Sequence, residues 1–172
     1  MNGLREAGFS LGSNLGDRLA MLRAARAALA TVAGRPPTAV SPVYETEPVG
    51  VTPEHAHLTF LNAVVVFEAG LDARAWLREI AKIETRLGRV RSADRNAPRP
   101  VDIDLLYCGG ELVDDGGVVV PHPRWAERLF VLRPLADVRA GLRLPGAERA
   151  VGDALAALDD RAGGVRLLAA MW

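Results

Sequence analysis

Cysteine is almost missing from the 172-residue sequence: Cys108 is the only one, which excludes a disulfide within the chain and a thiolate metal cluster. Net charge is missing too, because 21 basic residues balance 21 acidic ones. The overall charge therefore gives no reason to expect a nucleic acid or a membrane surface as partner. Long apolar runs are also absent, and the first residues lack the apolar core of a signal peptide. We expect one domain over residues 1–172 that works as a monomer in the cytoplasm.

What the sequence does contain is a series of short apolar segments with two different periods. Alternating residues predict strands at residues 7–11, 40–46, 60–68 and 101–107. Helical spacing predicts two helices between them, the first ending at Gly34 and the second at Gly88. Asn14 or Asp17 can cap the first helix, and Asp72 can cap the second.

The order strand, helix, strand, strand, helix, strand predicts an α+β fold of the ferredoxin-like split βαβ type, with added C-terminal helices and strands. Both helices should cover one face of an antiparallel sheet, which leaves the other face open for a ligand. The additions are short apolar runs at 111–115 and 118–120, a partly helical stretch at 125–132, a helix at 150–158 and a packed tail at 167–172. If the strand registers agree, the open face carries Phe60, Asn62, Asp102 and Asp104.

The strand that begins at Val101 carries two carboxylates, Asp102 and Asp104, which alternate with apolar residues. Positions two apart on a strand lie on the same face, roughly 6–7 Å from each other. Two like charges that close raise each other's pKa unless a cation lies between them. An Asp-x-Asp pair alone is more often a solvated strand end than a metal site, so the neighbouring residues decide.

Those neighbours are basic: four arginines lie just upstream, at positions 89, 91, 95 and 99. Pro98 and Pro100 flank Arg99. Carboxylates suit Mg²⁺ and guanidinium groups suit phosphate oxygens, so the combination predicts a site for a metal-bound polyphosphate. Residues 89–100 show no apolar periodicity, and we expect them to form a mobile loop that closes over the ligands.

Taken in order, several segments closely resemble the 6-hydroxymethyl-7,8-dihydropterin pyrophosphokinase family of the folate pathway, over nearly the whole chain. The matching segments are residues 11–17, 41–46, 60–63, 88–91, 98–106, 120–123 and 130–135. Most of them are weak signals alone. The segment Pro-Arg-Pro-Val-Asp-Ile-Asp-Leu-Leu at 98–106 is specific. Members of this family transfer the βγ-diphosphate of ATP to the hydroxymethyl group of a dihydropterin and release AMP.

The resemblance also implies roles for individual residues. It assigns two Mg²⁺ ions to Asp102 and Asp104, and catalysis to these two together with Arg89 and Arg99. ATP would be contacted by Arg89, Arg99, His122 and Arg128. The pterin would lie between Phe60 and Phe130, with its edge read by Asn62 and by the backbone at Thr46 and Val49.

Some positions depart from the family pattern or keep an open role. Asn96 stands where many members have an aromatic residue that caps the pterin, Pro123 replaces a tyrosine, and Ala81 replaces a longer polar residue. These departures predict looser loop closure and weaker nucleotide binding without a change of reaction. Glu84 flanks the apolar stripe of the second helix and has no charged partner one turn later, so both a surface role and a role in the site are open for it.

Two other classes of function fit parts of the pattern. From the residues alone, a two-metal nucleotidyl transferase or cyclase on a ferredoxin-like domain is nearly as well supported, and it would release pyrophosphate instead of AMP. An RNA-binding module shares the strand order but needs surface aromatic residues in a basic field. Aromatic residues make up only 5% of this chain and acids occupy the open face, which argues against RNA binding.

Overall fold

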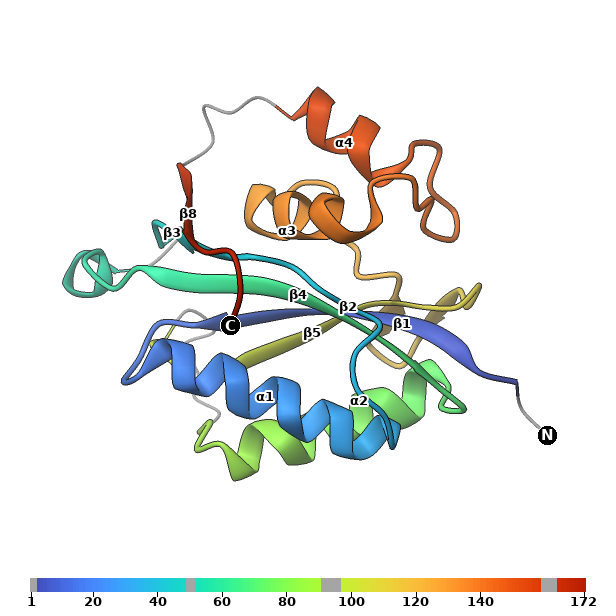
Figure 1. The fold of residues 1–172 in the computed structure, drawn as a ribbon, viewed down its shortest axis with the longest axis horizontal. Coiled ribbons are helices and arrows are strands. Elements are labelled where there is room, and N and C mark those ends of the chain that lie inside the picture. The colour runs from blue at the N-terminus through green and yellow to red at the C-terminus, as the bar shows by residue number, and fades with distance from the viewer. Residues whose placement is uncertain (1–2, 49–51, 91–96, 159–163) are drawn as a thin grey trace.

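The computed structural model describes residues 3–48, 52–90, 97–158 and 164–172. The strands are β1 (Arg5–Ser13), β2 (Ala39–Val40), β3 (Val43–Thr46), β4 (Phe60–Ala69), β5 (Asp102–Cys108), β6 (Val113–Asp115), β7 (Val118–Val120) and β8 (Val165–Ala169). The helices are α1 (Arg18–Ala33), α2 (Ala73–Arg86), α3 (Leu129–Arg139) and α4 (Val151–Ala157), with a short 3₁₀ turn at Pro53–His55. The central sheet lies between two helical layers (Figure 1).

The sheet has the predicted antiparallel topology. Its order is β5-β1-β4-β3-β8, with β2 also paired to β4, and every pair is antiparallel. The four strands β5-β1-β4-β3 have the order of a ferredoxin-like sheet, so the predicted fold class is confirmed. The strand expected at 40–46 is divided into β2 and β3, because Pro42 has no N–H to continue the ladder there.

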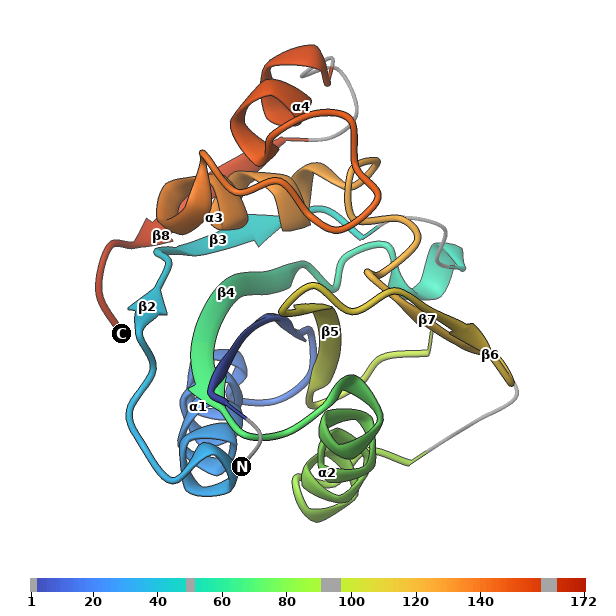
Figure 2. The same cartoon turned by 90° about the vertical axis from the view of Figure 1, so that its right-hand side faces the viewer.

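Helices α1 and α2 both cover one face of the sheet, as predicted (Figure 2). Each begins at an aspartate whose carboxylate accepts a hydrogen bond from a backbone N–H, Asp17 from Ala20 at 3.0 Å and Asp72 from Ala75 at 2.7 Å. The larger part of the core lies between these helices and the sheet. At its centre, the rings of Phe9 and Trp76 meet edge to face with their centroids 4.8 Å apart.

The other face is less open than the sequence suggested. Helix α3 packs there against the half of the sheet that carries Val64, Val66 and Leu106, and helix α4 packs on the outer side of α3 (Figure 1). Residues 121–128 form turns, so helix α3 starts at Leu129 and not at Trp125. The first half of the expected C-terminal tail belongs to strand β8, which extends the sheet beyond β3. Within the described residues, no helix is both long and apolar enough to cross a membrane.

The loop expected at 89–100 is held at both described ends. The backbone N–H of Arg89 donates to the carbonyl of Glu84 at 3.0 Å. At the other end, the N–H of Arg99 donates to Oδ1 of Asn14 at 2.8 Å. Residues 91–96, including Arg91, Arg95 and Asn96, lie outside the described part of the chain, so the closing loop stays a prediction.

Candidate functional site

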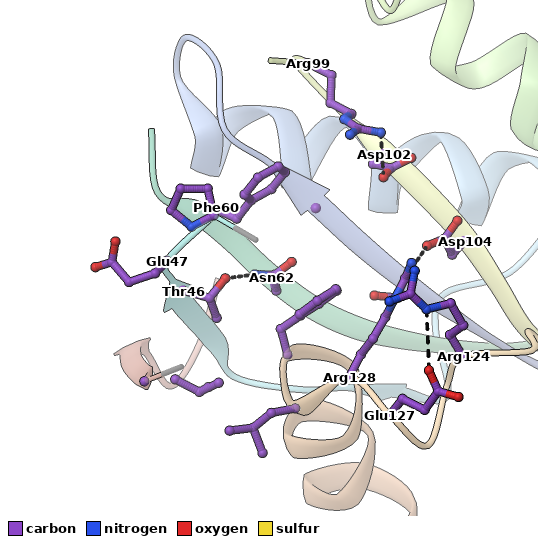
Figure 3. Close-up of a pocket in the computed structure, with 17 residues that line it drawn as sticks. Thr46, Glu47, Phe60, Asn62, Arg99, Asp102, Asp104, Arg124, Glu127 and Arg128 are labelled. Atoms are coloured by element: carbon purple, nitrogen blue, oxygen red, sulfur yellow. Dashed lines mark hydrogen bonds and ion pairs between the residues drawn. The ribbon is translucent and has the colours of Figure 1, made fainter. Parts of the chain in front are cut away.

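A pocket of about 690 Å³ opens on the part of the sheet that α3 and α4 leave uncovered (Figure 3). Most of the residues that the sequence singled out line it: Thr46, Phe60, Asn62, Arg99, Asp102, Asp104, Arg128 and Phe130. Arg89 and His122 contact its carboxylates from the side. Val49 lies outside the described residues.

Strand pairing explains why residues far apart in the sequence meet here. Gly12 on the central strand β1 pairs with Asp102 of β5 on one side and with Asn62 of β4 on the other. A Cβ atom at Gly12 would lie 3.4 Å from Oδ1 of Asn62 and 3.8 Å from Cδ1 of Phe60. The glycine therefore keeps the floor of the pocket open between the carboxylates and the amide.

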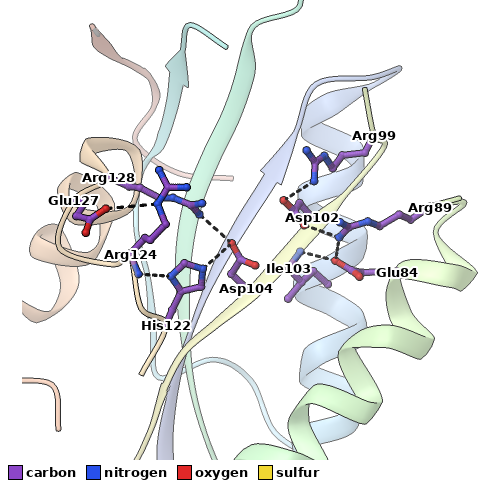
Figure 4. A network of polar contacts seen from close by, with 10 residues as sticks. All are labelled: Glu84, Arg89, Arg99, Asp102, Ile103, Asp104, His122, Arg124, Glu127 and Arg128. Atoms are coloured by element: carbon purple, nitrogen blue, oxygen red, sulfur yellow. Dashed lines mark hydrogen bonds and ion pairs between the residues drawn. The ribbon is translucent and has the colours of Figure 1, made fainter. Parts of the chain in front are cut away.

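Asp102 is closely paired with two arginines (Figure 4). Arg89 donates to its Oδ1 at 2.5 Å, and Arg99 donates to its Oδ2 at 3.2 Å. Both carboxylate oxygens thus already have a cationic partner in this structure. A metal ion that binds Asp102 would compete with these arginines for the carboxylate oxygens.

Asp104 is less well compensated. Its cationic partners are more distant, with Arg128 at 3.7 Å and the ring of His122 at 3.9 Å from Oδ2. Burial, helped by the negative charge of Asp102, raises the pKa of Asp104 to about 6, although Arg128 opposes the shift. The strand therefore holds a carboxylate whose charge is incompletely balanced, which is what a cation site requires.

His122 is held as a neutral donor. The backbone N–H of Arg124 donates to Nδ1 of His122 at 3.1 Å, so the proton of the neutral ring lies on Nε2, the atom that faces Asp104 (Figure 4). Burial lowers the pKa of His122, and the charges of Arg128 and Arg124 lower it further. A neutral imidazole can donate a hydrogen bond to a phosphate oxygen.

The opposite side of the pocket suits a flat ring with a polar edge. Phe60 and Phe130 both line the pocket and supply aromatic surfaces. The side-chain amide of Asn62, another lining residue, donates to Oγ1 of Thr46 at 2.7 Å (Figure 3). This bond leaves Oδ1 of Asn62 as an acceptor directed toward the pocket floor. The guanidinium group of Arg128 lies 5.6 Å from the centre of the Phe130 ring and so joins the two halves of the site.

Sequence reasoning left one buried residue without a role. Glu84, on α2, is only 7% exposed, and its Oε1 accepts hydrogen bonds from the backbone N–H of Ile103, at 2.8 Å, and from Arg89 (Figure 4). Burial raises the pKa of Glu84, while its bonds to Ile103 and Arg89 oppose the rise. The sequence showed only that an acidic residue lies beside the apolar stripe of a helix. It could not show that the backbone N–H of Ile103 is the partner of this residue.

Two charged residues at the rim were also not singled out. Arg124 and Glu127 both line the pocket, and they form an ion pair with 3.5 Å between Nε and Oε2. Both lie in the turn between His122 and Phe130, and this position is the only signal that the sequence offered.

Comparisons with known proteins show the family of the chain. A family model described as 7,8-dihydro-6-hydroxymethylpterin-pyrophosphokinase matches residues 8–140. The 2-amino-4-hydroxy-6-hydroxymethyldihydropteridine pyrophosphokinase of Bacillus subtilis is 43% identical over 129 residues, which cover 75% of each chain. The enzyme of the same name from Methylorubrum extorquens is 41% identical over 156 residues, 91% of this chain and 95% of the relative.

Solved structures with the same fold include the wild-type HPPK-DHPS of Plasmodium falciparum with pteroate, at a TM-score of 0.67 and 14% identity. Another is an HPPK-DHPS in complex with substrates, at a TM-score of 0.70 and 12% identity. The matches cover 91% and 90% of this chain but only 42% and 43% of those chains. At such low identity they support the fold alone.

Proposed function

The chain belongs to the 7,8-dihydro-6-hydroxymethylpterin-pyrophosphokinase family, and from this premise we propose how its pocket carries out the reaction. The reaction transfers the βγ-diphosphate of ATP to the hydroxymethyl oxygen of 6-hydroxymethyl-7,8-dihydropterin and releases AMP, in folate synthesis. ATP is the co-substrate. The observation that carries the proposal is the placement of Asp102 and Asp104 on the same pocket floor as Asn62 and the two aromatic rings.

Asp102 and Asp104 would hold Mg²⁺, two ions by the family resemblance, and the chemistry of the site fits this metal. Mg²⁺ is usually bound by one or two carboxylates, with substrate phosphates and water as its other ligands. Among the described residues, no group of three or more histidine, cysteine, aspartate or glutamate side chains gathers to hold a metal ion, so this part of the chain offers the pair alone. When bound, the metal supplies positive charge that stabilises the transferring phosphates.

The cations around the carboxylates would bind the triphosphate. Arg99 and Arg128 line the pocket on either side of the aspartates, and Arg89 and His122 contact the same two carboxylates. Guanidinium groups that now pair with carboxylates can exchange those partners for phosphate oxygens once a metal takes over the carboxylates. The neutral His122 would donate from Nε2.

The pterin would lie between Phe60 and Phe130. A heterocycle of this kind has two π faces and a rim of donors and acceptors, which match the two rings and the amide of Asn62. Thr46 orients that amide through its hydroxyl oxygen. The ring would then present its hydroxymethyl group toward the phosphates, on the side of Asp102 and Asp104.

The direct test is to incubate the protein with ATP, Mg²⁺ and 6-hydroxymethyl-7,8-dihydropterin. AMP and the pterin diphosphate should appear in equal amounts, whereas release of pyrophosphate would support the alternative nucleotidyl transferase, which the family does not favour. We further propose that the chain acts as a monomer in the cytoplasm, with no nucleic acid or membrane as partner. Light scattering that gives a mass of two chains or more would contradict the monomer.

A further inference from the structure

A short chain of hydrogen bonds joins helix α2 to the carboxylates of the pocket. It runs from the backbone N–H of Ile103 to Glu84, from Glu84 to Arg89, and from Arg89 to Asp102 (Figure 4). Ile103 lies between the two aspartates on β5, but its side chain points into the core on the helical side of the sheet. Glu84 therefore contacts the site from behind the strand and does not line the pocket.

The middle of this chain is a guanidinium group shared by two carboxylates. Nη1 of Arg89 donates to Oε1 of Glu84 and also to Oδ1 of Asp102. Glu84 is more buried than Asp102, with 9% of its side chain exposed against 27%. Its second donor is a backbone N–H, that of Ile103, whereas the second donor of Asp102 is the long side chain of Arg99. When Asp102 changes partner, Arg89 can remain with Glu84.

We propose that Glu84 is a positioning residue. It holds Arg89 when Asp102 binds a metal ion, and so leaves the carboxylate of Asp102 available to that ion. Without the second carboxylate, Arg89 would have only Asp102 as a carboxylate partner within this cluster. The Arg89–Asp102 pair would then compete more strongly with the metal. Arg89 would also lose the contact that keeps it beside the phosphates once the pair is broken. This role rests on the metal site proposed above.

Two substitutions of Glu84 separate the effect of the position of its carboxylate from the effect of its charge. Glu84→Gln keeps the length of the side chain and an oxygen that can accept from Ile103, but it removes the charge that retains Arg89. Glu84→Asp keeps the charge and shortens the side chain by one methylene group, which draws the carboxylate away from Arg89 and Ile103. If Glu84 acted only through its negative field, the aspartate variant would behave like the parent protein.

The measurement is binding of Mn²⁺, as a spectroscopic substitute for Mg²⁺, to the full chain with a non-hydrolysable ATP analogue. Electron paramagnetic resonance measures the concentration of free Mn²⁺, so the affinity is obtained without measuring enzyme activity. We expect both variants to bind Mn²⁺ about tenfold more weakly than the parent. Glu79→Gln is the matched control, because Glu79 lies on the same helix but is bonded to Lys82 near the surface, and it should leave Mn²⁺ affinity unchanged.

Two further measurements would detect a purely structural role of Glu84. Thermal unfolding and amide exchange at Ile103 report whether β5 stays in place, and Glu84→Gln should change them little, because its oxygen still accepts from Ile103. Parental Mn²⁺ affinity in both variants would overturn the proposal, and so would a loss confined to Glu84→Gln, which would indicate a field effect alone. If the parent itself binds no Mn²⁺ with the analogue, the metal site fails and not merely the role of Glu84.

Discussion

Asp102 and Asp104 are two positions apart on one strand, yet they differ in how well their charge is compensated. Asp102 has arginine donors at 2.5 and 3.2 Å, whereas the cationic partners of Asp104 lie at 3.7 and 3.9 Å. Burial acts on the less compensated group and raises the pKa of Asp104 to about 6 from an ordinary value of 3.8. The two carboxylates should therefore respond in opposite ways when their charge is removed from the metal-free protein.

We expect Asp104→Asn to stabilise the metal-free protein at pH 7. A carboxyl group whose pKa is higher in the folded protein binds its proton more readily when folded, so its unfavourable contribution is present above pH 6 and disappears as the pH falls toward 4. Because the side chain is 34% exposed, solvent screening reduces the gain to about 1 kcal/mol. Urea unfolding with a chelator at pH 5 and pH 7 should show the advantage of the variant shrinking at the lower pH.

Asp102→Asn is the matched control for that experiment. It removes the carboxylate that Arg89 and Arg99 share, so we expect it to lower the free energy of unfolding at pH 7. Equal stabilisation by both substitutions would show that simple repulsion governs the pair and that the arginine contacts contribute little.

Both carboxylates should nevertheless be needed for turnover. If they hold the metal, Asp102→Ala or Asp104→Ala should lower the rate of AMP release by several powers of ten, at about 1.4 kcal/mol for each power. Far-ultraviolet circular dichroism should show that the fold is kept. Near-parental turnover in either variant at ordinary Mg²⁺ concentrations would rule out the two-carboxylate metal site.

Phe130 should matter for the pterin more than for ATP. We expect Phe130→Ala to weaken pterin binding by about 1–3 kcal/mol through lost stacking and apolar contact. Calorimetry with the pterin and, separately, with an ATP analogue measures the difference between the two ligands. Because Arg128 lies 5.6 Å over this ring, Phe130→Leu serves as a control that keeps an apolar support beneath the guanidinium group. Equal losses for both ligands in Phe130→Ala would mean that the ring mainly supports Arg128.

At the scale of the elements, features that depend on neighbours in the sequence were predictable. The caps Asp17 and Asp72 act within their own helices, and the alternation along β5 was enough to place both aspartates on one face. Helix α3 was predicted to begin too early and was followed only to Leu132, because Pro134 lies inside it and a proline ordinarily ends a helical pattern. Packing against the sheet outweighs that local preference.

Strand β8 could not be predicted from its own residues. Its sequence, Val-Arg-Leu-Leu-Ala, shows no clear alternation, and three of its five side chains are exposed. It is a strand because it pairs with β3, more than a hundred residues earlier in the chain. Because neither face of β8 is fully buried, burial leaves no alternation in its sequence.

The position of Asn14 between the first strand and the first helix was predicted, but its contacts were not. It was a candidate cap for the first helix, but it binds the segment before β5 instead: its N–H donates to the carbonyl of Arg99 at 3.3 Å, and its Oδ1 accepts from the N–H of Arg99 at 2.8 Å. Asn14 thus connects the end of β1 to an arginine of the pocket.

We expect Asn14→Ala to lower the free energy of unfolding by about 1 kcal/mol, as for the loss of one hydrogen bond. The amide of Arg99 should also exchange faster with solvent, because it loses its acceptor. Asn14→Asp is the control, since a carboxylate oxygen can still accept from that N–H. Unchanged exchange at Arg99 in the alanine variant would show that the segment is held by other contacts.

Across the whole molecule, the site combines parts that the sequence reveals to different degrees. The carboxylates, Asn62 and Phe60 follow from strand alternation and a shared sheet face. The contribution of Glu84 depends on the backbone N–H of Ile103 on β5, and a contact with a backbone group cannot be predicted from residue types. The extent of the pocket is set by how far α3 and α4 cover the open face, and this depends on packing between segments distant in the sequence.

Beyond the pairing of β8 with β3, Trp172 attaches the C-terminal end of the chain to the rest of the molecule. Nε1 of Trp172 donates to the carbonyl of Ser41 at 2.8 Å, and the guanidinium group of Arg26 on α1 lies 4.5 Å from the centre of its ring. These contacts join the end of the chain to the first helical layer and to the segment between β2 and β3. They also hold the edge strand β8, whose Val165 lines the pocket beside Thr46.

We expect Trp172→Ala to lower the free energy of unfolding by about 1–3 kcal/mol, since it removes both a partly buried hydrogen bond and the ring that lies against Arg26. Amides of residues 165–169 should exchange faster, and pterin affinity should fall slightly because one wall of the pocket loosens. Trp172→Phe keeps a ring beneath Arg26 but has no N–H for Ser41, so its loss of stability should be about half as large. Because the carboxylates are on β5, at the opposite edge of the sheet, affinity for an ATP analogue should not change. If β8 exchanges no faster in the alanine variant, the pairing with β3 alone holds this edge, and Trp172 only covers α1.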